Sequence, residues 1–325
     1  MTARLNRRIF VEKTLCGTAA LAAVTSAGAS AVTPIAYAQA PESKPRVPRG
    51  RIGHLEVSRL LLGGNLLTHY THSRDLMYVY ALTRHYNTRE KIFETLALAE
   101  AHGINTLVIH TALGVMDMLR EYRHKLGGKI QWIICPTAVM EPGLAEFKDQ
   151  VQMLVDEGAE AVYVWGVRAD DLVARGQPDL IAQAVEAAKA KGVLCGVGAH
   201  DLRVIEECER LKVPADFYIK TLHHHSYPTG PKPEDITAPY KEIPGYWCSH
   251  PKETIELMQR VEKPWIAFKV MAAGAIPPSS AFRYAIRGGA DFILAGMFDF
   301  EIAEDVRILN EVLAAELKRP RPWRA

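Results

Sequence analysis

The chain lacks the features that mark membrane proteins, zinc-binding modules and disulfide-stapled domains. No stretch approaches the roughly 18 consecutive apolar residues of a membrane span. The five cysteines have neither the spacing of a zinc site nor that of a small disulfide framework. The formal net charge of the 325 residues is only +2, and no basic run favours a nucleic-acid partner. We therefore expect a globular protein with a small-molecule substrate, no nucleic-acid partner and no membrane partner once its leader is removed.

The first forty residues resemble an export leader rather than part of a folded domain. Arg7 and Arg8 lie in a basic start, an Ala-rich and weakly apolar stretch follows at 14–36, and Ala38 and Ala40 end two sites suited to signal peptidase. The paired arginines are similar to a twin-arginine signal. We expect residues 1–40 to be a signal peptide that the twin-arginine export machinery recognises, and 41–325 to be a single periplasmic domain. An ordinary amphipathic start is the alternative.

The rest of the chain alternates short β-branched runs with amphipathic stretches. Its length of about 285 residues suits one barrel of eight parallel strands. The predicted strands are continuously apolar, as expected when both faces of a parallel sheet are buried. We expect strands at 58–63, 105–110, 130–135, 161–165, 193–197, 217–221, 265–270 and 292–295. We expect helices at 89–102, 115–126, 144–157, 178–191, 202–211, 252–261, 279–287 and 303–317. The sequence thus predicts an α/β fold, a (β/α)8 TIM barrel.

An open, doubly wound sheet is the structural alternative to this barrel. It is disfavoured because no Gly-x-Gly-x-x-Gly turn follows the first predicted strand. Two connections, at 65–88 and 223–251, are longer than a barrel requires, and both follow the carboxyl ends of strands. Barrel active sites form at that end, so these loops are expected to line the site.

Three segments in the same order resemble the aldo-keto reductase family. They are RIGHLEVSRLLLGG at 51–64, HGINTLVIHTALG at 102–114 and GVLCGVGAH at 192–200. The first is similar to the family's hairpin leading into strand 1, the second to its GINFFDTA segment, and the third to its IGVSN segment. Each motif alone is weak, but their order over about 51–317 implies the same barrel fold.

The resemblance does not extend to the family's catalytic residues, which are an Asp, a Tyr, a Lys and a His. His110 occupies the Asp position, and the loop at 112–118 contains no Tyr. Strand 3 ends IICP without a Lys, and strand 4 reads VYVWG without a His. The nicotinamide-phosphate region after strand 8 is altered to GMFDFE. Hydride transfer needs an acid that protonates the alkoxide, so the family's standard reaction is not expected here.

Two lysines inside the predicted strands suggest a different chemistry. Lys220 and Lys269 need an explanation because burying an amine in an apolar strand is costly. An amine with a lowered pKa acts as a base or forms a Schiff base with a carbonyl. We expect both lysines to face one pocket. The alternative is that each lies at a strand tip, paired with a carboxylate such as Asp299 or Asp75.

His200 and His224 complete the predicted catalytic set as acid–base groups. With Asp299 they also form a candidate divalent-metal site, since imidazole and carboxylate are common ligands. The alternative is histidines that bind substrate or serve the structure. As cofactor, a divalent metal is a candidate and NAD(P) is favoured less. The residues predicted to bind substrate are Asn65, His72, Arg74, Asp75, His110, His223 and Asp299.

These observations favour an exported barrel enzyme that acts on a small carbonyl or carbohydrate by acid–base chemistry of the isomerase, epimerase or lyase type. A divergent NAD(P)-dependent oxidoreductase and a catalytically inactive ligand-binding barrel are the two alternatives. Fold alone does not choose among them.

Overall fold

The computed structural model describes residues 46–325 except 74–75, 113, 237–247 and 316–317. The proposed signal peptide at 1–40 lies outside the described residues, as do the predicted substrate-binding residues Arg74 and Asp75. Within the described residues, no helix has both the length and the apolar character needed to cross a bilayer.

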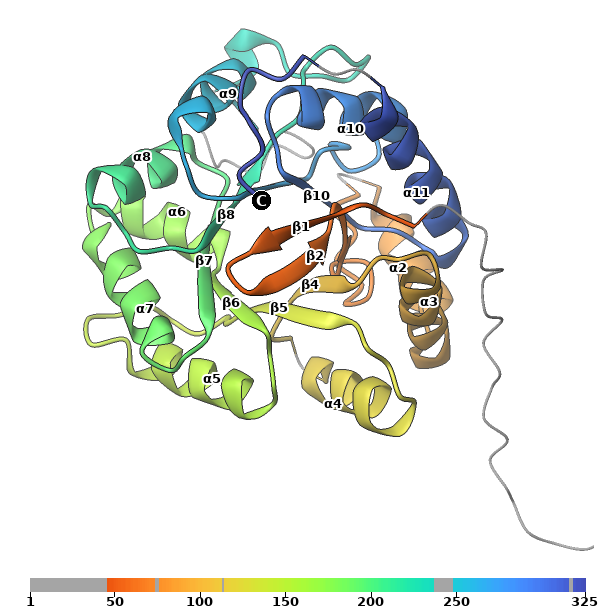
Figure 1. The fold of residues 1–325 in the computed structure, drawn as a ribbon, viewed down its shortest axis with the longest axis horizontal. Helices are drawn as coiled ribbons and strands as arrows, with labels where there is room; N and C mark the ends of the chain where they lie inside the picture. Colours follow the sequence, from red (N-terminus) through yellow and green to blue (C-terminus); the bar gives the residue numbers. More distant parts are fainter. Residues whose placement is uncertain (1–45, 74–75, 113, 237–247, 316–317) are drawn as a thin grey trace, which may run out of the picture. The chain divides into compact units, whose positions relative to one another are not determined.

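A β-hairpin closes the amino end of the barrel. Its strands, β1 (Arg49–Ile52) and β2 (Leu55–Ser58), pair antiparallel around a turn in which Gly53 has a φ of 57°, a conformation that glycine adopts without strain. Buried side chains of the hairpin, including Ile52 and Val57, join the apolar cluster that fills the barrel. Figure 1 shows the hairpin lying across this end, as the resemblance to the reductases implied.

Eight parallel strands form the closed barrel, in the order β10-β3-β4-β5-β6-β7-β8-β9. The strands are β3 (Leu60–Gly63), β4 (Thr106–His110), β5 (Gln131–Cys135), β6 (Ala161–Val164), β7 (Leu194–Ala199), β8 (Phe217–Thr221), β9 (Trp265–Phe268) and β10 (Phe292–Ala295). All eight predicted strands are present, so the (β/α)8 barrel is confirmed and the open sheet is wrong. The pairing of β10 with β3 closes the barrel.

Helices surround the barrel. They are α2 (Met77–Tyr86), α3 (Arg89–Ala101), α4 (Val115–Arg120), α5 (Ala145–Asp156), α6 (Gly166–Ala174), α7 (Asp179–Lys189), α8 (Leu202–Arg210), α9 (Pro251–Arg260), α10 (Pro278–Arg287) and α11 (Asp299–Ala314), with one π-helical turn at Glu121–Lys125 and one 3-10 turn at Pro233–Asp235. The sequence did not predict α2 and α6. Neither has a side chain that caps its first turn.

Strand side chains alternate between the barrel interior and the helix layer. The interior cluster takes the inward members Leu61, Val108, Ile133, Ala161, Phe217, Ile219, Ile266, Phe292 and Leu294. The residues between them join the larger cluster under the helices, as Tyr218 and Ala267 do. This parity decides which side chains at the strand ends face a cavity and which face a helix.

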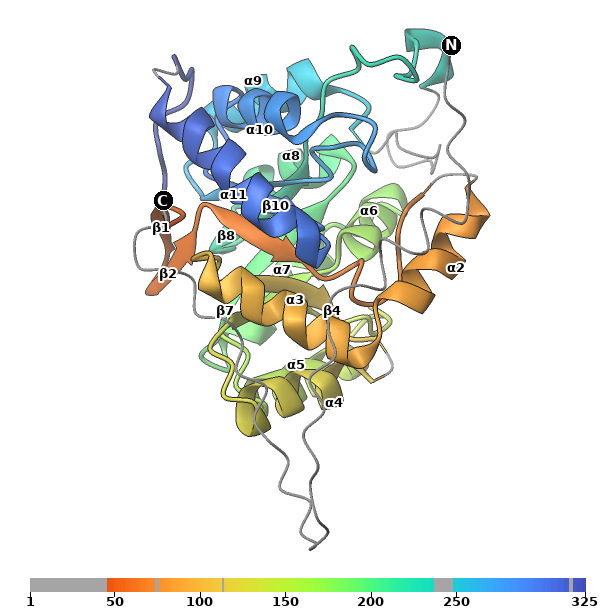
Figure 2. The same cartoon turned by 90° about the vertical axis from the view of Figure 1, so that its right-hand side faces the viewer.

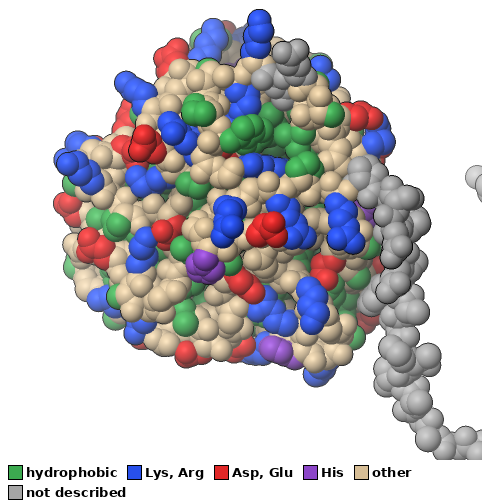
Figure 3. All heavy atoms as spheres, in the orientation of Figure 1, with side chains coloured by type: hydrophobic (Ala, Val, Ile, Leu, Met, Phe, Trp, Pro, Cys, Tyr) green, Lys and Arg blue, Asp and Glu red, His purple; other side chains and the backbone are tan. Residues whose placement is uncertain are grey.

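The C-terminal tail packs at the amino end, beside the hairpin (Figure 1). Arg321 is fully buried, and its guanidinium contacts Asp291 Oδ2 at 2.6 Å and donates to the carbonyls of Val261, Gly289 and Lys263. The Arg59 guanidinium lies 4.2 Å from the Trp323 ring centroid. A buried ion pair with its remaining donors satisfied is costly to break, so the tail is an integral part of the barrel. Positive and negative side chains are interspersed over this face (Figure 3).

Candidate functional site

A cavity of about 900 Å³ opens at the carboxyl end of the strands. Figure 2 shows α2, whose residues Val79 and Thr83 line this cavity, at the end of the barrel opposite the hairpin. The inward side chains of the last strand positions form its floor, and the segments after β3, β6, β9 and β10 form its walls. Strand-end cavities of this kind are where barrel enzymes place their reacting groups.

His200 and Asp170 form a hydrogen-bonded pair at one wall. His200 follows β7, and its Nδ1 lies 2.7 Å from Asp170 Oδ2 on α6. The other carboxylate oxygen of Asp170 accepts the backbone N–H groups of His200 and Asp201, each at 3.0 Å. With Nδ1–H donated to the carboxylate, the lone pair of His200 is on Nε2, toward the cavity that the ring lines. Burial lowers the pKa of His200, although Asp170 opposes that shift, so the neutral imidazole is favoured.

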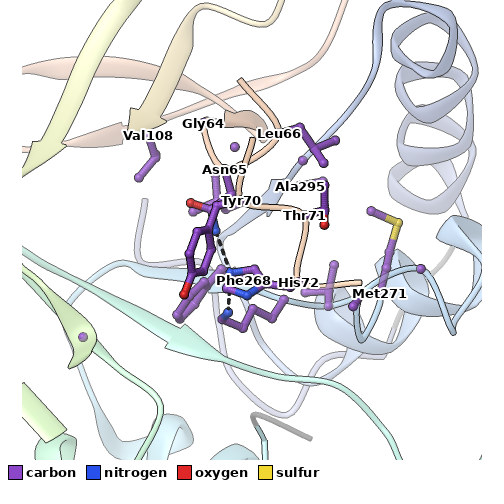
Figure 4. Close-up of a pocket in the computed structure, with 18 of the residues that line it drawn as sticks. Gly64, Asn65, Leu66, Tyr70, Thr71, His72, Val108, Phe268, Met271 and Ala295 are labelled. Carbon is purple, nitrogen blue, oxygen red and sulfur yellow. Dashed lines mark hydrogen bonds between the residues drawn. The ribbon is translucent and has the colours of Figure 1, made fainter. Parts of the chain in front are cut away.

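A second polar group joins the loop after β3 to the end of β9. Asn65 Nδ2 donates to His72 Nε2 at 2.9 Å, and Lys269 Nζ donates to the same nitrogen at 3.1 Å. Figure 4 shows His72 next to Asn65 and Phe268. Burial, then the charges of Lys269 and His200, lower the pKa of His72 to about 2. His72 therefore stays neutral and acts here as a hydrogen-bond acceptor that holds the amine of Lys269.

Backbone strain is concentrated in the same two segments. His72 has a φ of 50° and Lys269 a φ of 55°, both in the left-handed region that non-glycine residues rarely adopt. His69, Ala272 and Ala273 share that region. Each such residue costs on the order of 1 kcal/mol, and strain of this kind clusters at functional sites. The paired side chains of His72 and Lys269 thus come from two strained turns that the rest of the fold holds in place.

The floor of the cavity is uncharged. Burial lowers the pKa of His110 at the end of β4, which favours its neutral form. Cys135 and Tyr163, inward residues of β5 and β6, hydrogen-bond to each other, and burial raises the pKa of the thiol to about 12 and that of the phenol above its ordinary value. Neither ionises at neutral pH. Aldo-keto reductases carry a lysine and a histidine on the third and fourth strands of the barrel. In this chain those strands are β5 and β6, and they present neutral groups.

The wall formed by the start of α11 is acidic. Glu301 and Asp305 line the cavity there, and Glu301 Oε2 accepts the backbone N–H of Phe298 at 2.8 Å. Asp299, the first residue of α11, accepts from the Tyr86 hydroxyl at 2.7 Å and from Lys91 Nζ at 3.1 Å. Carboxylates therefore already neutralise the positive end of this helix, where a phosphate would otherwise bind.

Of the predicted catalytic residues, His200 and Lys269 line the cavity and Lys220 does not. The expectation that both lysines face one pocket is wrong. Phe217 and Ile219 of β8 point into the barrel, so Lys220 points outward into the helix layer. It is 1% exposed, and its Nζ donates to the carbonyl of Thr221 at 3.1 Å and to its Oγ1 at 2.8 Å. Burial lowers the pKa of Lys220.

The predicted metal ligands also lie apart. His200 pairs with Asp170, His224 Nε2 lies 3.1 Å from Ser280 Oγ, and Asp299 pairs with Lys91. Among the described residues, no group of three or more His, Cys, Asp or Glu side chains is placed to hold a metal ion. The set His200, His224 and Asp299 is therefore a wrong prediction as a shared metal site.

The other predicted binding residues divide between the cavity and the surrounding structure. Asn65, His72 and His110 line the cavity. His223 is 1% exposed and accepts the backbone N–H of Cys248 at 3.2 Å, which indicates a structural imidazole. His224 lines a separate pocket of about 600 Å³ next to α9 and α10. Asp299 does not line the large cavity, because its carboxylate is taken by Tyr86 and Lys91.

Sequence reasoning missed several groups of the site. Asp170 lies on α6, the helix that was not predicted, and the doublet Asp170–Asp171 looks like a solvated surface pair. Tyr163 and Cys135 lie in apolar strands, where they look like core residues. The one available signal for the pair was a carboxylate soon after the fourth barrel strand (β6) and a histidine after the fifth (β7). The carboxyl ends of neighbouring parallel strands lie side by side, so these two residues were candidates for contact.

No protein-family model matches the chain, and no curated protein matches it significantly in sequence. Solved structures do match in fold. Two from Pseudomonas aeruginosa, both provisionally assigned as aldo-keto reductases, superpose with a TM-score of 0.54 each, at 17% and 18% sequence identity. They cover 82% of this chain, and the matches span 96% and 94% of their own lengths. This likeness shows that the chain shares the (β/α)8 barrel fold of these two structures.

Proposed function

We propose that this protein is an acid–base enzyme that acts on a small carbonyl or carbohydrate substrate, in the manner of an isomerase, epimerase or lyase. The observation that carries the proposal is the cavity shared by the His200–Asp170 pair and the amine of Lys269. An imidazole with its lone pair toward a cavity is a general base, and a nearby amine stabilises the oxyanion that proton removal creates.

The proposed step begins with a carbonyl oxygen hydrogen-bonded to Lys269 Nζ. His200 Nε2 removes the proton from the adjacent carbon, and the electron pair of the broken C–H bond moves to form an enediolate. Asp170 stabilises the resulting imidazolium, and His72 and Asn65 hold the amine in position. Return of the proton to the same carbon gives epimerisation. Return to the former carbonyl carbon, together with transfer of the neighbouring hydroxyl proton to the former carbonyl oxygen, gives isomerisation. The protein's charge is unchanged over the cycle.

The test is proton exchange in D2O with a panel of aldoses and ketoses, followed by ¹H NMR. We expect deuterium at the carbon next to the carbonyl for at least one substrate, and a loss of at least about 100-fold in rate for His200→Gln, as is usual for a general base. Lys269→Met should lower kcat with little effect on folding. The exposed residues His54 and Lys191 supply matched controls, His54→Gln and Lys191→Met. Equal exchange rates in His200→Gln and the wild type would remove the proposal.

The pH profile separates Asp170 from a merely structural residue. Asp170 raises the pKa of His200 against the effect of burial, so Asp170→Asn should move the acidic limb of kcat/KM to lower pH as well as lowering kcat. A fall in rate with an unmoved acidic limb would contradict the assigned role of Asp170.

A nicotinamide-dependent oxidoreductase is the alternative that the fold likeness keeps open. The neutral groups on β5 and β6 and the carboxylates at the start of α11 count against the standard reductase mechanism. A nucleotide absorbance that copurifies with the protein, or NADPH oxidation by a keto substrate, would favour this alternative. Tight binding of a sugar without exchange or oxidation would favour an inactive ligand-binding barrel.

Export through the twin-arginine machinery is a further part of the proposal, supported by the composition of residues 1–40. Expression of the full chain in a bacterium with that machinery, followed by fractionation, tests it. We expect periplasmic protein for the wild type and retention in the cytoplasm for the double variant Arg7→Lys, Arg8→Lys. Equal export of both would contradict this route.

A further inference from the structure

The acidic wall of the cavity has an unusual member. Asp305 and Glu301 lie one turn apart on α11, so their side chains share one face of the helix, and both line the cavity. Glu301 uses one carboxylate oxygen to accept the Phe298 N–H. Asp305 is 4% exposed, yet among the described residues its carboxylate accepts no hydrogen bond and pairs with no cation.

Burial without a partner is expensive for a carboxylate. Burial, then the nearby Glu301 and Glu304, raise the pKa of Asp305 to about 7. If Asp305 were enclosed in an apolar core, an apolar side chain in its place would make the protein more stable. Asp305 instead lines the cavity, where a positively charged group of a ligand can pair with it, as in a cation-binding subsite.

We propose that Asp305 and Glu301 bind an ammonium group of the substrate, so that the cavity takes a small amine-bearing carbonyl or carbohydrate. This inference rests on the proposed function for the position of the carbonyl, which lies at Lys269 and His200. The cavity then offers a positive group to the substrate's oxygen and negative groups to its nitrogen. Such complementarity selects orientation as well as class, because a reversed substrate would face like charges.

An ammonium ion fits this wall better than a divalent metal. Calcium prefers six to eight oxygen ligands and magnesium six, whereas the described residues at this wall supply two carboxylates. An ammonium group needs only a few acceptors, and a charge-assisted hydrogen bond to a buried carboxylate is among the stronger ones in proteins.

Matched pairs of amine and hydroxyl compounds test the inference by calorimetric titration. The pairs are glucosamine with glucose, galactosamine with galactose, and aminoacetone with hydroxyacetone. We expect the amine to bind at least about tenfold more tightly in at least one pair, and we expect Asp305→Asn to abolish that preference. Glu304→Gln, which changes an exposed carboxylate on the same helix, should retain it.

Two outcomes overturn the inference. One is the same affinity, or no binding, for both members of every pair. The other is Mg²⁺ or Ca²⁺ binding to chelator-treated protein that is lost in Asp305→Asn, which would assign the wall to a metal. The same titrations with His200→Gln keep the two proposals apart, since the amine preference should survive without proton exchange. Proton exchange together with equal affinities for the amine and the hydroxyl compounds would contradict the ammonium subsite but not the proposed function.

Discussion

The ionisation of Asp305 should make the ligand-free protein less stable as the pH rises. The ordinary pKa of an aspartate, 3.8, applies to the unfolded chain, and in the fold the pKa is raised to about 7. Below pH 3.8 the carboxyl is protonated in both states and costs nothing. Between these values the unfolded state ionises first, so the folded state loses relative stability until the pH passes the folded pKa.

The size of this effect follows from the shift. About three pH units at about 1.4 kcal/mol each give an upper bound of roughly 4 kcal/mol above pH 7. Asp305→Asn removes the ionisation but keeps the shape and polarity of the side chain. The unfolding free energy of the variant relative to the wild type should therefore rise by about 2–4 kcal/mol between pH 4.5 and pH 8.

Urea unfolding followed by circular dichroism at several pH values measures this difference. The slope with pH is the informative quantity, because any constant cost of the new amide cancels. Glu186→Gln is the control, since Glu186 is exposed and lies on α7, away from Asp305 in the sequence and on another helix. Parallel stability curves for the wild type and Asp305→Asn would refute the reasoning, because they would mean that Asp305 ionises alike in both states.

Three other substitutions probe the fold by unfolding measurements. Arg321→Met removes the 2.6 Å ion pair of the buried Asp291, which among the described residues keeps only Arg319 at 3.8 Å as a charged partner, and should cost about 3–5 kcal/mol. Arg307→Met on the surface should cost less than about 1 kcal/mol, and similar losses would contradict the role of the tail. Lys220→Met should raise the unfolding free energy by about 1 kcal/mol or more at pH 6. The gain should shrink toward pH 10, because burial lowers the pKa of Lys220, and a pH-independent difference would count against this. Ala273→Gly, at an exposed position with a φ of 57°, should stabilise by about 1 kcal/mol, and a loss of stability would argue against strain there.

The barrel could be predicted because its signals are local and repeated. Eight apolar runs, each bounded by turn residues, define the strands whatever their neighbours are. Two helices were missed: α2 lies inside the long connection at 65–88, and α6 begins at Gly166, almost directly after β6 ends at Val164. Helix α6 forms because Ala169 and Leu172 are buried against the barrel, which is information that only the tertiary structure holds, whereas in α2 only Thr83 is buried.

The site was harder to predict for the same reason that the strands were easy. A strand that is buried on both faces shows no alternation, so the sequence does not reveal that Lys220 points away from the barrel axis. Lys269 follows the last residue of β9 in a left-handed turn, where strand parity no longer applies. The partnership of His200 with Asp170 joins two segments 30 positions apart, through a helix whose start has no signal.

The separation of the tail from the cavity has a consequence for how the protein can change. The Arg321–Asp291 pair lies at the amino end of the barrel, and the strained turns of His72 and Lys269 lie at the other end. Effects of substitutions at distant sites that share no partners add together. Substitutions that stabilise the protein around the tail can therefore offset destabilising substitutions at the cavity without changing the geometry of the cavity. Variation in substrate choice and maintenance of the scaffold are thus open to independent selection.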